Sequence, residues 1–597
     1  MKLGQSHKQH TFLKMAATST PWASAPENNV DREPDETTTL LGSQDDQTSN
    51  SGSIPGRKRS SSSASDRPKV SLGRFRTITV ILSTWALIFL QASNMSGVTT
   101  TQSAIAEDLK EYENAMWFST AYLISTSALS PLVGRLATIF SPRILALPIG
   151  FFFAAGGIAT ASAQSFGVFI LGRVLTGVAG AGIMTLAVIL VLELTGKKSR
   201  GVFIGLVNCG FTIGLSTGAV VYGALLPVIG WRFLFGAQAP VALAASLGVF
   251  FSLPSGFGVS SESKDRNTRE KLARIDYAGA LMLTTSIVLF LFGLSGDVKW
   301  VPIVLSLAAL SVFAAIEVFV AADPIIPLSV LRSRSILLSC VTQLGFMSAR
   351  WTLLFYSPVY VGVVWGYAPA LAGSILIPTN IGFGSGGLIV GWLHVRRNGA
   401  FWLPSIIGLV IFGITLFGLS LVATAETAKW LFILAVFLNG LATGASLNYT
   451  LAHLLHLSRP SEHFITTSLL GTFRGFGGSF GTAIGGGIFY RALRRGLTEG
   501  FSGLKHGLTP ERKDLITRLI GSSAAVHNGG LSPAEEAIAV EGYASASRFT
   551  WQAAAALAVL VVILQAATGW SGPQDKVEDE EAEVRANLLE NEGVVEA

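Results

Sequence analysis

The sequence predicts an all-α polytopic membrane protein, with fourteen helices arranged as two six-helix halves and an inserted helix pair. Three observations predict this fold class: the composition, the number of long apolar runs, and the placement of basic residues between these runs. Half of the 597 residues are hydrophobic and only 13% are charged. The mean hydropathy of +0.52 is too high for a soluble protein of this size. The 64 glycines and 36 phenylalanines suit closely packed helices with a lipid-facing rim better than a β-barrel.

The apolar runs define the predicted helices, because a helix needs about 20 apolar residues to cross a bilayer. The first six runs are 77–98, 115–133, 143–162, 166–192, 202–225 and 233–253. The other eight runs are 277–295, 301–320, 336–358, 369–391, 402–421, 429–451, 465–489 and 550–569. The chain is predicted to begin with a disordered cytosolic tail (1–74), followed by a six-helix half (75–253) and a cytosolic linker (254–276). The inserted pair (277–320) and a second six-helix half (321–570) come next, and this second half includes a long non-cytosolic loop (491–548). An acidic cytosolic tail (571–597) ends the chain.

Basic residues are concentrated in the even-numbered loops between the runs. The short odd-numbered loops hold only Lys110, Arg232, Lys299 and Lys429. Short loops rich in Lys and Arg stay in the cytosol, so both termini are predicted to be cytosolic. The long loop 491–548 carries eight basic residues, but long loops cross the membrane largely regardless of charge.

The segment Leu129–Ile144 places a small basic loop between the second and third runs. We expect Gly134 to form a tight turn where the chain leaves the bilayer, and Arg135 and Arg143 to lie at the cytosolic interface.

The N-terminal tail contains a pattern similar to a membrane sorting signal. Glu36 stands four residues before the pair Leu40 and Leu41, which resembles an acidic dileucine signal that sorting adaptors bind. This pattern favours the vacuolar membrane, with the plasma membrane as the alternative.

Two predicted spans carry glycines at intervals of four residues, which predicts smooth strips for close helix contact. These glycines are Gly210, Gly214 and Gly218 in the fifth span and Gly477, Gly481 and Gly485 in the thirteenth. Their repetition in both halves is typical of a transporter built from two rocking halves.

Polar side chains within the spans are candidates for contact with a substrate or with the coupling ion, because an ionisable group in a membrane needs a cavity or a partner. Arg173, Arg350 and Arg474 are the charged candidates, and the alternative for each is a structural arginine bonded to backbone carbonyls. The neutral candidates are Asn94, Gln102, Asn208, Gln343, Asn380, Asn439 and Asn448. For these residues the alternative is hydrogen bonding between helices.

The order of several motifs resembles the major facilitator superfamily, specifically its fourteen-span branch of drug:proton antiporters and fungal vacuolar basic amino acid transporters. Gly134–Arg143 resembles the loop signature after the second span, Gly205–Gly223 resembles the antiporter motif of the fifth, and Arg173 resembles the buried arginine associated with proton coupling in the fourth. Arg474 lies in a stretch similar to the thirteenth-span pattern. The resemblance implies the major facilitator fold over about residues 75 to 570, and transport coupled to protons.

Two positions depart from the family pattern. Thr138 stands where the loop signature carries an aspartate that clamps the two halves, and Asn94 stands where relatives often carry a buried acid. Arg135 and Arg143 therefore need other partners, and Glu193, near the cytosolic end of the fourth span, is the candidate for this gating role.

The sequence thus predicts a secondary transporter of a small solute that works by alternating access. The resemblance implies proton coupling and transport of a vacuolar amino acid or a related metabolite. The alternatives are a plasma-membrane multidrug exporter and a non-transporting sensor or scaffold. The three arginines favour an anionic, zwitterionic or neutral substrate, whereas the vacuolar relatives imply basic amino acids.

Several other functions lack a motif in the sequence. No phosphate loop or catalytic triad indicates an enzyme, and we expect no cofactor or metal and no nucleic-acid partner. A monomer in the lipid bilayer is expected.

Overall fold

The computed structural model describes residues 73–194, 200–254, 257, 275–320, 333–394, 401–458, 463–504, 507–528 and 530–570. These residues are mostly helical, contain no strand, and belong to one compact unit, Lys69–Ala597. The proposed sorting signal at Glu36, Leu40 and Leu41 lies outside the described residues.

The first helices of the chain form the N-terminal group. They are α1 (Arg74–Leu109), α2 (Trp117–Ile139), α3 (Pro142–Ala161), α4 (Phe166–Leu194), α5 (Arg200–Gly236) and α6 (Gln238–Ser252). In this group α3 packs on α4, α1 on α5 and α2 on α4, around a core that includes Leu87, Phe153 and Leu186.

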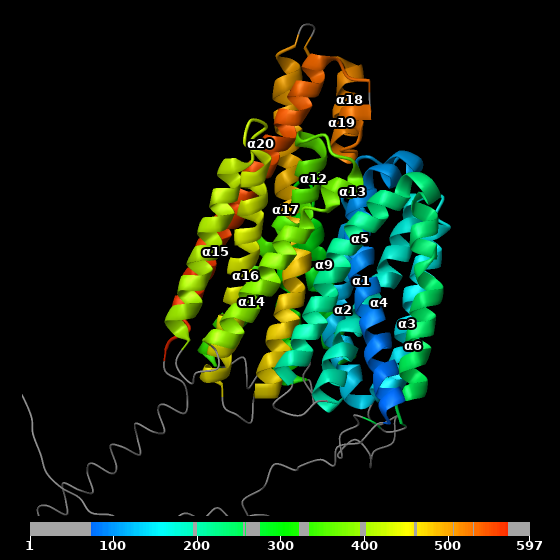
Figure 1. The fold of residues 1–597 in the computed structure, drawn as a ribbon, viewed down its shortest axis with the longest axis vertical. Coiled ribbons are helices and arrows are strands. Elements are labelled where there is room, and N and C mark those ends of the chain that lie inside the picture. The colour runs from blue at the N-terminus through cyan, green and yellow to red at the C-terminus, as the bar shows by residue number, and fades with distance from the viewer. Residues whose placement is uncertain are drawn as a thin grey trace, which may run out of the picture. The chain divides into compact units, whose positions relative to one another are not determined.

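The later helices form the inserted pair and the C-terminal group. The inserted pair is α9 (Tyr277–Leu294) and α10 (Trp300–Phe319); the C-terminal group is α12 (Arg334–Val364), α13 (Pro369–Gly373), α14 (Leu376–Leu393), α15 (Trp402–Val422), α16 (Lys429–Leu457), α17 (His463–Ser502) and α20 (Pro533–Ala566). Its core includes Phe346, Phe412 and Trp551. The two groups lie side by side (Figure 1), and α9 packs on α2 of one and α17 of the other.

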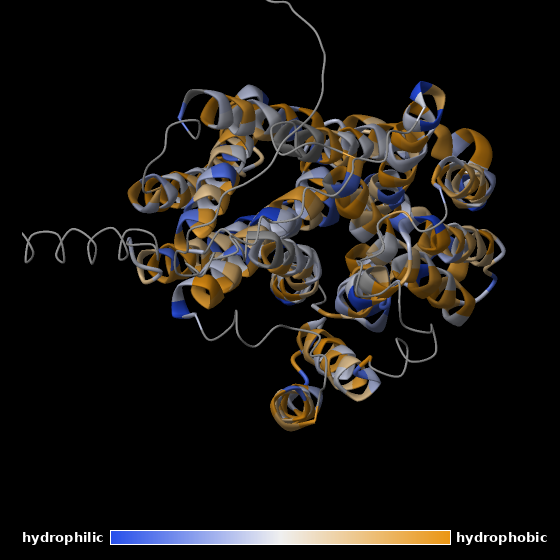
Figure 2. Cartoon of the chain, turned by 90° about the horizontal axis from the view of Figure 1, so that it is seen from below, coloured by the Kyte–Doolittle hydropathy of each residue, from blue (hydrophilic) through white to orange (hydrophobic). Residues whose placement is uncertain are grey.

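Each predicted apolar run falls mainly on helical residues. The run 233–253 is shared by α5 and α6, and the run 369–391 by α13 and α14. Among the described residues, ten helices are long and apolar enough to cross a membrane. Many large apolar side chains are exposed, including Phe151, Leu388 and Ile414, and hydrophobic residues cover much of the helix surface in Figure 2. Such a surface suits lipid contact.

Local sequence explains several helix ends. Pro142 begins α3 and Pro369 begins α13, where the missing N–H of proline leaves no helical bond unmade. Gly230 has φ 72° and ψ 163°, a conformation that strongly favours glycine, and it breaks the long helix α5. Residues after Gly230 therefore begin a new helical direction, close to the predicted start of the sixth run.

The structure corrects the expected turn at Gly134. This residue lies inside α2, which continues to Ile139, and the chain turns at Phe140 and Ser141. An interior glycine costs a helix only about 1 kcal/mol, whereas Pro142 pre-forms the start of α3, so the turn lies next to the proline.

The segment predicted as a long loop, 491–548, is mostly helical. The helix α17 extends to Ser502, α18 (Pro510–Gly521) and α19 (Ala525–Asn528) follow, and α20 already begins at Pro533. We call the end of the unit where α1 ends the outer end, and we call α18 and α19 the roof. Figure 1 shows the roof beside the projecting ends of α17 and α20.

Candidate functional site

A buried arginine–asparagine pair joins two helices of the N-terminal group. Arg173 on α4 donates from Nη1 to Asn94 Oδ1 on α1 at 2.6 Å, and from Nε to the carbonyl oxygen of Phe118 at 2.9 Å. The guanidinium carbon also lies 4.9 Å from the centre of the Tyr122 ring, a favourable position for a cation over an aromatic face. One nitrogen, Nη2, has no hydrogen-bond partner among the described residues.

Further hydrogen bonds extend this pair towards α6. Asn94 donates from Nδ2 to Gln238 Oε1 at 2.8 Å, and Gln238 in turn donates to the hydroxyl of Tyr222. Asn94 is therefore fixed at both ends of its amide, and its position depends on α4 and α6 together.

A second pair of the same composition joins two helices of the C-terminal group. Arg350 on α12 donates from Nη1 to Asn439 Oδ1 on α16 at 3.1 Å, and from Nη2 to the carbonyl oxygen of Thr379 at 3.4 Å. Asn439 donates from Nδ2 to Thr415 Oγ1 at 3.1 Å. In the first pair arginine lies on the fourth span of its half and asparagine on the first. In the second pair arginine lies on the first span of its half and asparagine on the fourth, so the two residue types have exchanged positions.

Both pairs hold a positive charge without a carboxylate partner. Arg173 is 1% exposed and Arg350 is 3% exposed, and neither forms an ion pair within the described part of the chain. A buried guanidinium is stable only when its donors are satisfied. The hydrogen bonds to asparagine and to backbone carbonyls are consistent with a structural role, and Arg173 Nη2 is left without a hydrogen-bond partner in the described part of the chain.

Among the described residues, hydrogen bonds between the two groups involve neutral polar side chains and Arg474. Arg474 on α17 donates to Asn208 Oδ1 on α5 at 3.2 Å. Asn380 on α14 donates to Ser216 Oγ on α5 at 2.7 Å. These bonds connect predicted site residues from both halves of the chain.

Helices α2 and α17 meet through two serines. Ser127 and Ser479 share a hydrogen bond between their hydroxyls, and Ser479 donates to the carbonyl oxygen of Leu123 at 2.6 Å. A hydroxyl is a weak signal in a sequence, because serine is common in membrane helices for many reasons. Sequence analysis therefore missed both residues, as it missed Gln238 and Ser216.

Towards the outer end, α5 approaches the backbone of α13. A Cβ built on Gly223 would lie 2.4 Å from the Ala370 nitrogen, and one built on Gly373 would lie 2.8 Å from Ala219 Cβ. A real Cβ does not fit at such distances, so glycine at both positions permits the outer ends of the two groups to close.

The glycines predicted to pack helices lie at two helix contacts. Those of α5 face α1, where a Cβ on Gly218 would lie 2.5 Å from Ser93 Cα, and those of α17 face α12, where a Cβ on Gly481 would lie 2.2 Å from the Ser348 oxygen. The other members face the same helices: Gly210, Gly214, Gly477 and Gly485.

The predicted gating residues are spread around the ends of α2, α3 and α4. The Arg143 guanidinium carbon lies 4.6 Å from the centre of the Phe250 ring. Arg135 is half-buried on α2 and Glu193 is exposed on α4. The side chain of Thr138 lies outside the described part of the structure.

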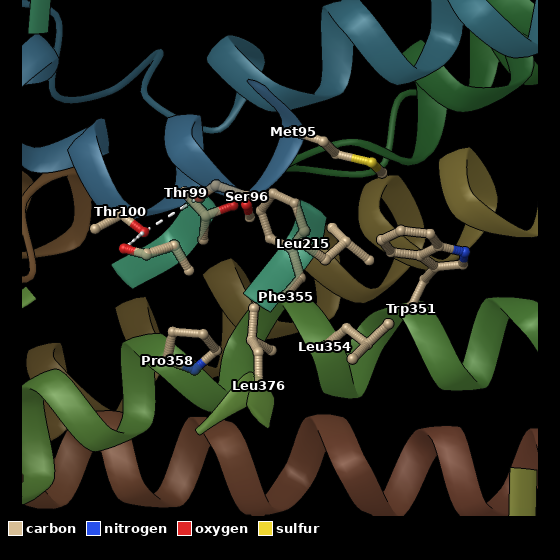
Figure 3. Close-up of a pocket in the computed structure, with 11 residues that line it drawn as sticks. Met95, Ser96, Thr99, Thr100, Leu215, Trp351, Leu354, Phe355, Pro358 and Leu376 are labelled. Atoms are coloured by element: carbon tan, nitrogen blue, oxygen red, sulfur yellow. Dashed lines mark hydrogen bonds between the residues drawn. The ribbon is translucent and has the colours of Figure 1, made fainter. Parts of the chain in front are cut away.

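An apolar cavity lies between the two groups (Figure 3). Met95, Leu215, Trp351, Leu354, Phe355 and Leu376 line it, and its volume is about 20 Å³. Thr100 adds a hydroxyl, which donates to the carbonyl oxygens of Ser96 at 3.2 Å and Ala219 at 3.4 Å. Arg173, Arg350 and Arg474 lie outside the lining of this cavity.

A second cavity of about 70 Å³ continues towards the outer end and shares Thr99 and Phe355 with the first. Its lining is more polar and includes Gln102, Thr120 and Tyr356. We call this second cavity the outer chamber. The two cavities lie next to each other, with the apolar one at the centre and the more polar one towards the outer end.

This arrangement of two helix groups around central cavities agrees with the family match of the sequence. Residues 84–482 match the model described as the Major Facilitator Superfamily. The chain belongs to this superfamily. Its members are transporters rather than enzymes, so the protein is an integral membrane transporter with the all-helical fold predicted from the sequence.

Similar proteins include fungal transporters of two kinds. Multidrug resistance protein fnx1 of Schizosaccharomyces pombe is 27% identical over 82% of this chain and 91% of its own length. Vacuolar basic amino acid transporter 1 of Saccharomyces cerevisiae is 29% identical over 56% of this chain and 59% of its own length.

Among solved structures, a bacterial homologue of the human lysosomal transporter Spinster, in an inward-facing and unoccupied conformation, aligns with a TM-score of 0.56. It covers 84% of this chain and 100% of the bacterial chain at 16% identity. A likeness at this identity concerns the fold.

Proposed function

We propose that this superfamily member is a proton-coupled secondary transporter that moves a small solute by alternating access. In this proposal the chain crosses the membrane fourteen times, both termini are cytosolic, and the N-terminal and C-terminal groups rock against each other as two six-helix halves. The inserted pair α9 and α10 accompanies this motion at the side.

The observation that carries the proposal is the contrast between contacts within the groups and contacts between them. Within each group a buried arginine–asparagine pair ties two helices. Between the groups, the described hydrogen bonds mostly join neutral side chains, such as Asn380 and Ser216. A single hydrogen bond contributes about 0.5–1.5 kcal/mol net, so the interface between the groups is able to open while each group stays intact.

The charge distribution argues against a cationic substrate, and we propose that the substrate is a neutral or zwitterionic amino acid or a related metabolite. Arg173 and Arg350 are buried without carboxylate partners, and their charge repels a cationic substrate near the centre of the membrane. The free Nη2 of Arg173 is the donor best suited to respond when substrate or a proton enters.

We place the transporter in the vacuolar membrane, because of the dileucine pattern at Glu36, Leu40 and Leu41 and the vacuolar relative in yeast. A sorting adaptor is the partner proposed for the N-terminal tail.

Counterflow in proteoliposomes tests the proposal. The purified protein is screened with neutral, acidic and basic amino acids, organic acids and lipophilic cations. We expect exchange of neutral or zwitterionic amino acids, and a dependence on an imposed pH gradient. Arg173→Lys keeps the positive charge and Arg173→Met removes it. Loss of exchange in both variants, with folding intact, indicates that transport requires the planar set of N–H donors of the guanidinium and not the charge alone.

Two results contradict the proposal. Preference for arginine or lysine over neutral solutes removes the charge argument. Failure of every solute to exchange, with folded protein, favours a sensor or scaffold.

A second candidate function is multidrug efflux at the plasma membrane, and the apolar cavity favours it. Leu215, Trp351 and Phe355 offer a surface for a lipophilic drug. A fluorescent fusion and its Leu40→Ala/Leu41→Ala variant separate the two locations: a vacuolar signal that is lost in the variant supports the first candidate. A plasma-membrane signal, together with drug sensitivity on deletion, supports efflux.

A further inference from the structure

The outer chamber has a lining without charged side chains among the described residues. It contains hydroxyls, including those of Thr99, Thr120 and Tyr356, and the carboxamide of Gln102. A charged solute would lose water in this chamber without gaining a counter-charge, which is unfavourable. The lining therefore fits an uncharged solute.

Gln102 is the side chain in this chamber with the greatest unused hydrogen-bonding capacity. No hydrogen bond joins it to another described residue, whereas Thr120 donates to its own helix at Met116 and Tyr543 donates to Leu519. A primary carboxamide offers two donors and an acceptor, and it matches a second amide or a hydroxyl of a neutral ligand.

Two aromatic rings provide an apolar wall beside these polar groups. The rings of Tyr356 and Phe489 are stacked, with centroids 4.6 Å apart and planes 25° apart, and both residues line the chamber. A flat ring of a ligand packs well against such a wall, and offset stacking or edge contact adds to the apolar burial.

The roof completes the chamber with residues from the helical outer segment. Ser523 Oγ hydrogen-bonds with Ser103 Oγ on α1 at 3.2 Å. A Cβ built on Gly521 would lie 2.3 Å from the Tyr112 carbonyl oxygen, so the end of α18 is seated directly on the connection between α1 and α2. Gly521 and Ser523 line the chamber as well.

A histidine fixes the other side of the roof. His527 Nε2 donates to the Val363 carbonyl oxygen at the end of α12, at 2.8 Å, and Nδ1 bonds to Glu536 Oε1 on α20, at 2.9 Å. The roof and its connecting residue Ser523 thus contact the N-terminal group at Ser103 and the C-terminal group at Val363, and both Gly521 and Ser523 border the chamber.

We propose that this outer chamber is a binding subsite for an uncharged solute that combines a flat ring with an amide or hydroxyl group, and that Gln102 and the roof select this solute. The subsite deepens the proposed transport function and rests on it, because the chamber continues into the central cavity through Thr99 and Phe355. It narrows the proposed solute from an amino acid or related metabolite to an uncharged metabolite. Gln102 acts as the hydrogen-bonding partner, and the Tyr356–Phe489 wall acts as the apolar one.

Three small probes of similar size, each with one benzene ring, test this proposal: benzamide, benzoate and benzylamine, which are neutral, anionic and cationic. Binding to the purified full-length protein is measured by ligand-detected NMR titration without any gradient. We expect benzamide to bind about tenfold tighter than either ion, and Gln102→Leu to weaken benzamide binding by about tenfold. Gln102→Glu should raise the affinity for benzylamine, because it supplies the missing counter-charge.

Gln552→Leu is the matched control, since Gln552 is an exposed glutamine on α20. It should bind all three probes as the unaltered protein does. Gly521→Ala displaces the roof and should also weaken benzamide binding, with the melting temperature of each variant reporting its folding.

Equal binding of the three probes, no binding of benzamide, or unchanged benzamide binding in Gln102→Leu overturns the proposed subsite. Counterflow is measured on the same preparations. If probe selectivity fails while counterflow persists, only the subsite is wrong, and if counterflow fails while benzamide binds selectively, the transport proposal is wrong.

Discussion

Closure of the outer end depends on two glycines, and adding a methyl group to either should favour the outward-open conformation. Gly223→Ala places a carbon 2.4 Å from the Ala370 nitrogen, and Gly373→Ala places one 2.8 Å from Ala219 Cβ. Non-bonded carbons pack best at about 3.5–4.0 Å. The helices α5 and α13 must therefore separate by about 1 Å, and the closed outer end loses its packing.

The size of the effect follows from the cost of overpacking. Forcing an extra methyl group into a closely packed contact costs about 1–3 kcal/mol. This cost falls on the closed outer end and is absent when α5 and α13 separate. The ratio of open to closed molecules should therefore rise by roughly 5- to 150-fold, with the larger value for Gly223 because its clash is the closer one.

Labelling of a cysteine in the cavities measures this shift. Thr99→Cys places the reporter where the two cavities meet, in a Cys209→Ser background because Cys209 is exposed and Cys340 is buried. A membrane-impermeant maleimide added to the outer side should react faster in Gly223→Ala and Gly373→Ala. Gly384→Ala is the control, because nothing lies within 4 Å of a Cβ at Gly384.

Labelling rates equal to those of Gly384→Ala in both variants would refute the reasoning. They would mean that the contact between α5 and α13 does not limit access from the outer side.

Three further predictions concern the hydrogen bonds described above. Asn439→Leu leaves the buried Arg350 donor unpaired and should destabilise the protein by about 1–3 kcal/mol, measured as a lower melting temperature in detergent; an unchanged melting temperature contradicts it. Arg474→Met removes the hydrogen bond to Asn208 between the groups. It should change the labelling rate of an introduced cysteine from the cytosolic side by severalfold, and should change the free energy of unfolding by no more than about 1 kcal/mol. A larger loss of stability would instead make this arginine structural. Ser532→Ala removes the capping box at the start of α20 and should cost about 1 kcal/mol, seen as faster proteolysis of the outer segment, with equal proteolysis as the contrary result.

The positions of the apolar helices could be predicted from the sequence because lipid exposure requires long apolar runs, and runs such as 402–421 and 429–451 match α15 and α16 closely. The start of α20 within the segment 491–548 could have been predicted. Ser532, Pro533 and Glu535 form the pattern of a capping box, which is a local signal for a helix start, yet the segment around it is too polar to register as an apolar run.

The contacts of the candidate site could not be predicted, because they join residues far apart in the chain. Arg173 and Asn94 are separated by 79 residues, and Arg350 and Asn439 by 89. The sequence indicated that each was a polar residue in a helix, but only the packing of helices decides which asparagine faces which arginine. Gln102 lies on α1, and its place in the lining of the outer chamber depends on tertiary packing in the same way.

The two arginine–asparagine pairs suggest a way to redesign the electrostatic potential of the transport pathway. Exchanging the residues of one pair, as in Asn94→Arg/Arg173→Asn, moves a positive charge from α4 to α1 while composition and net charge stay constant. The protein already contains this reversed orientation in its other half, where arginine lies on α12 and asparagine on α16. A change of solute preference in such a double variant would then report the position of the charge alone, without the loss of charge that accompanies an ordinary substitution.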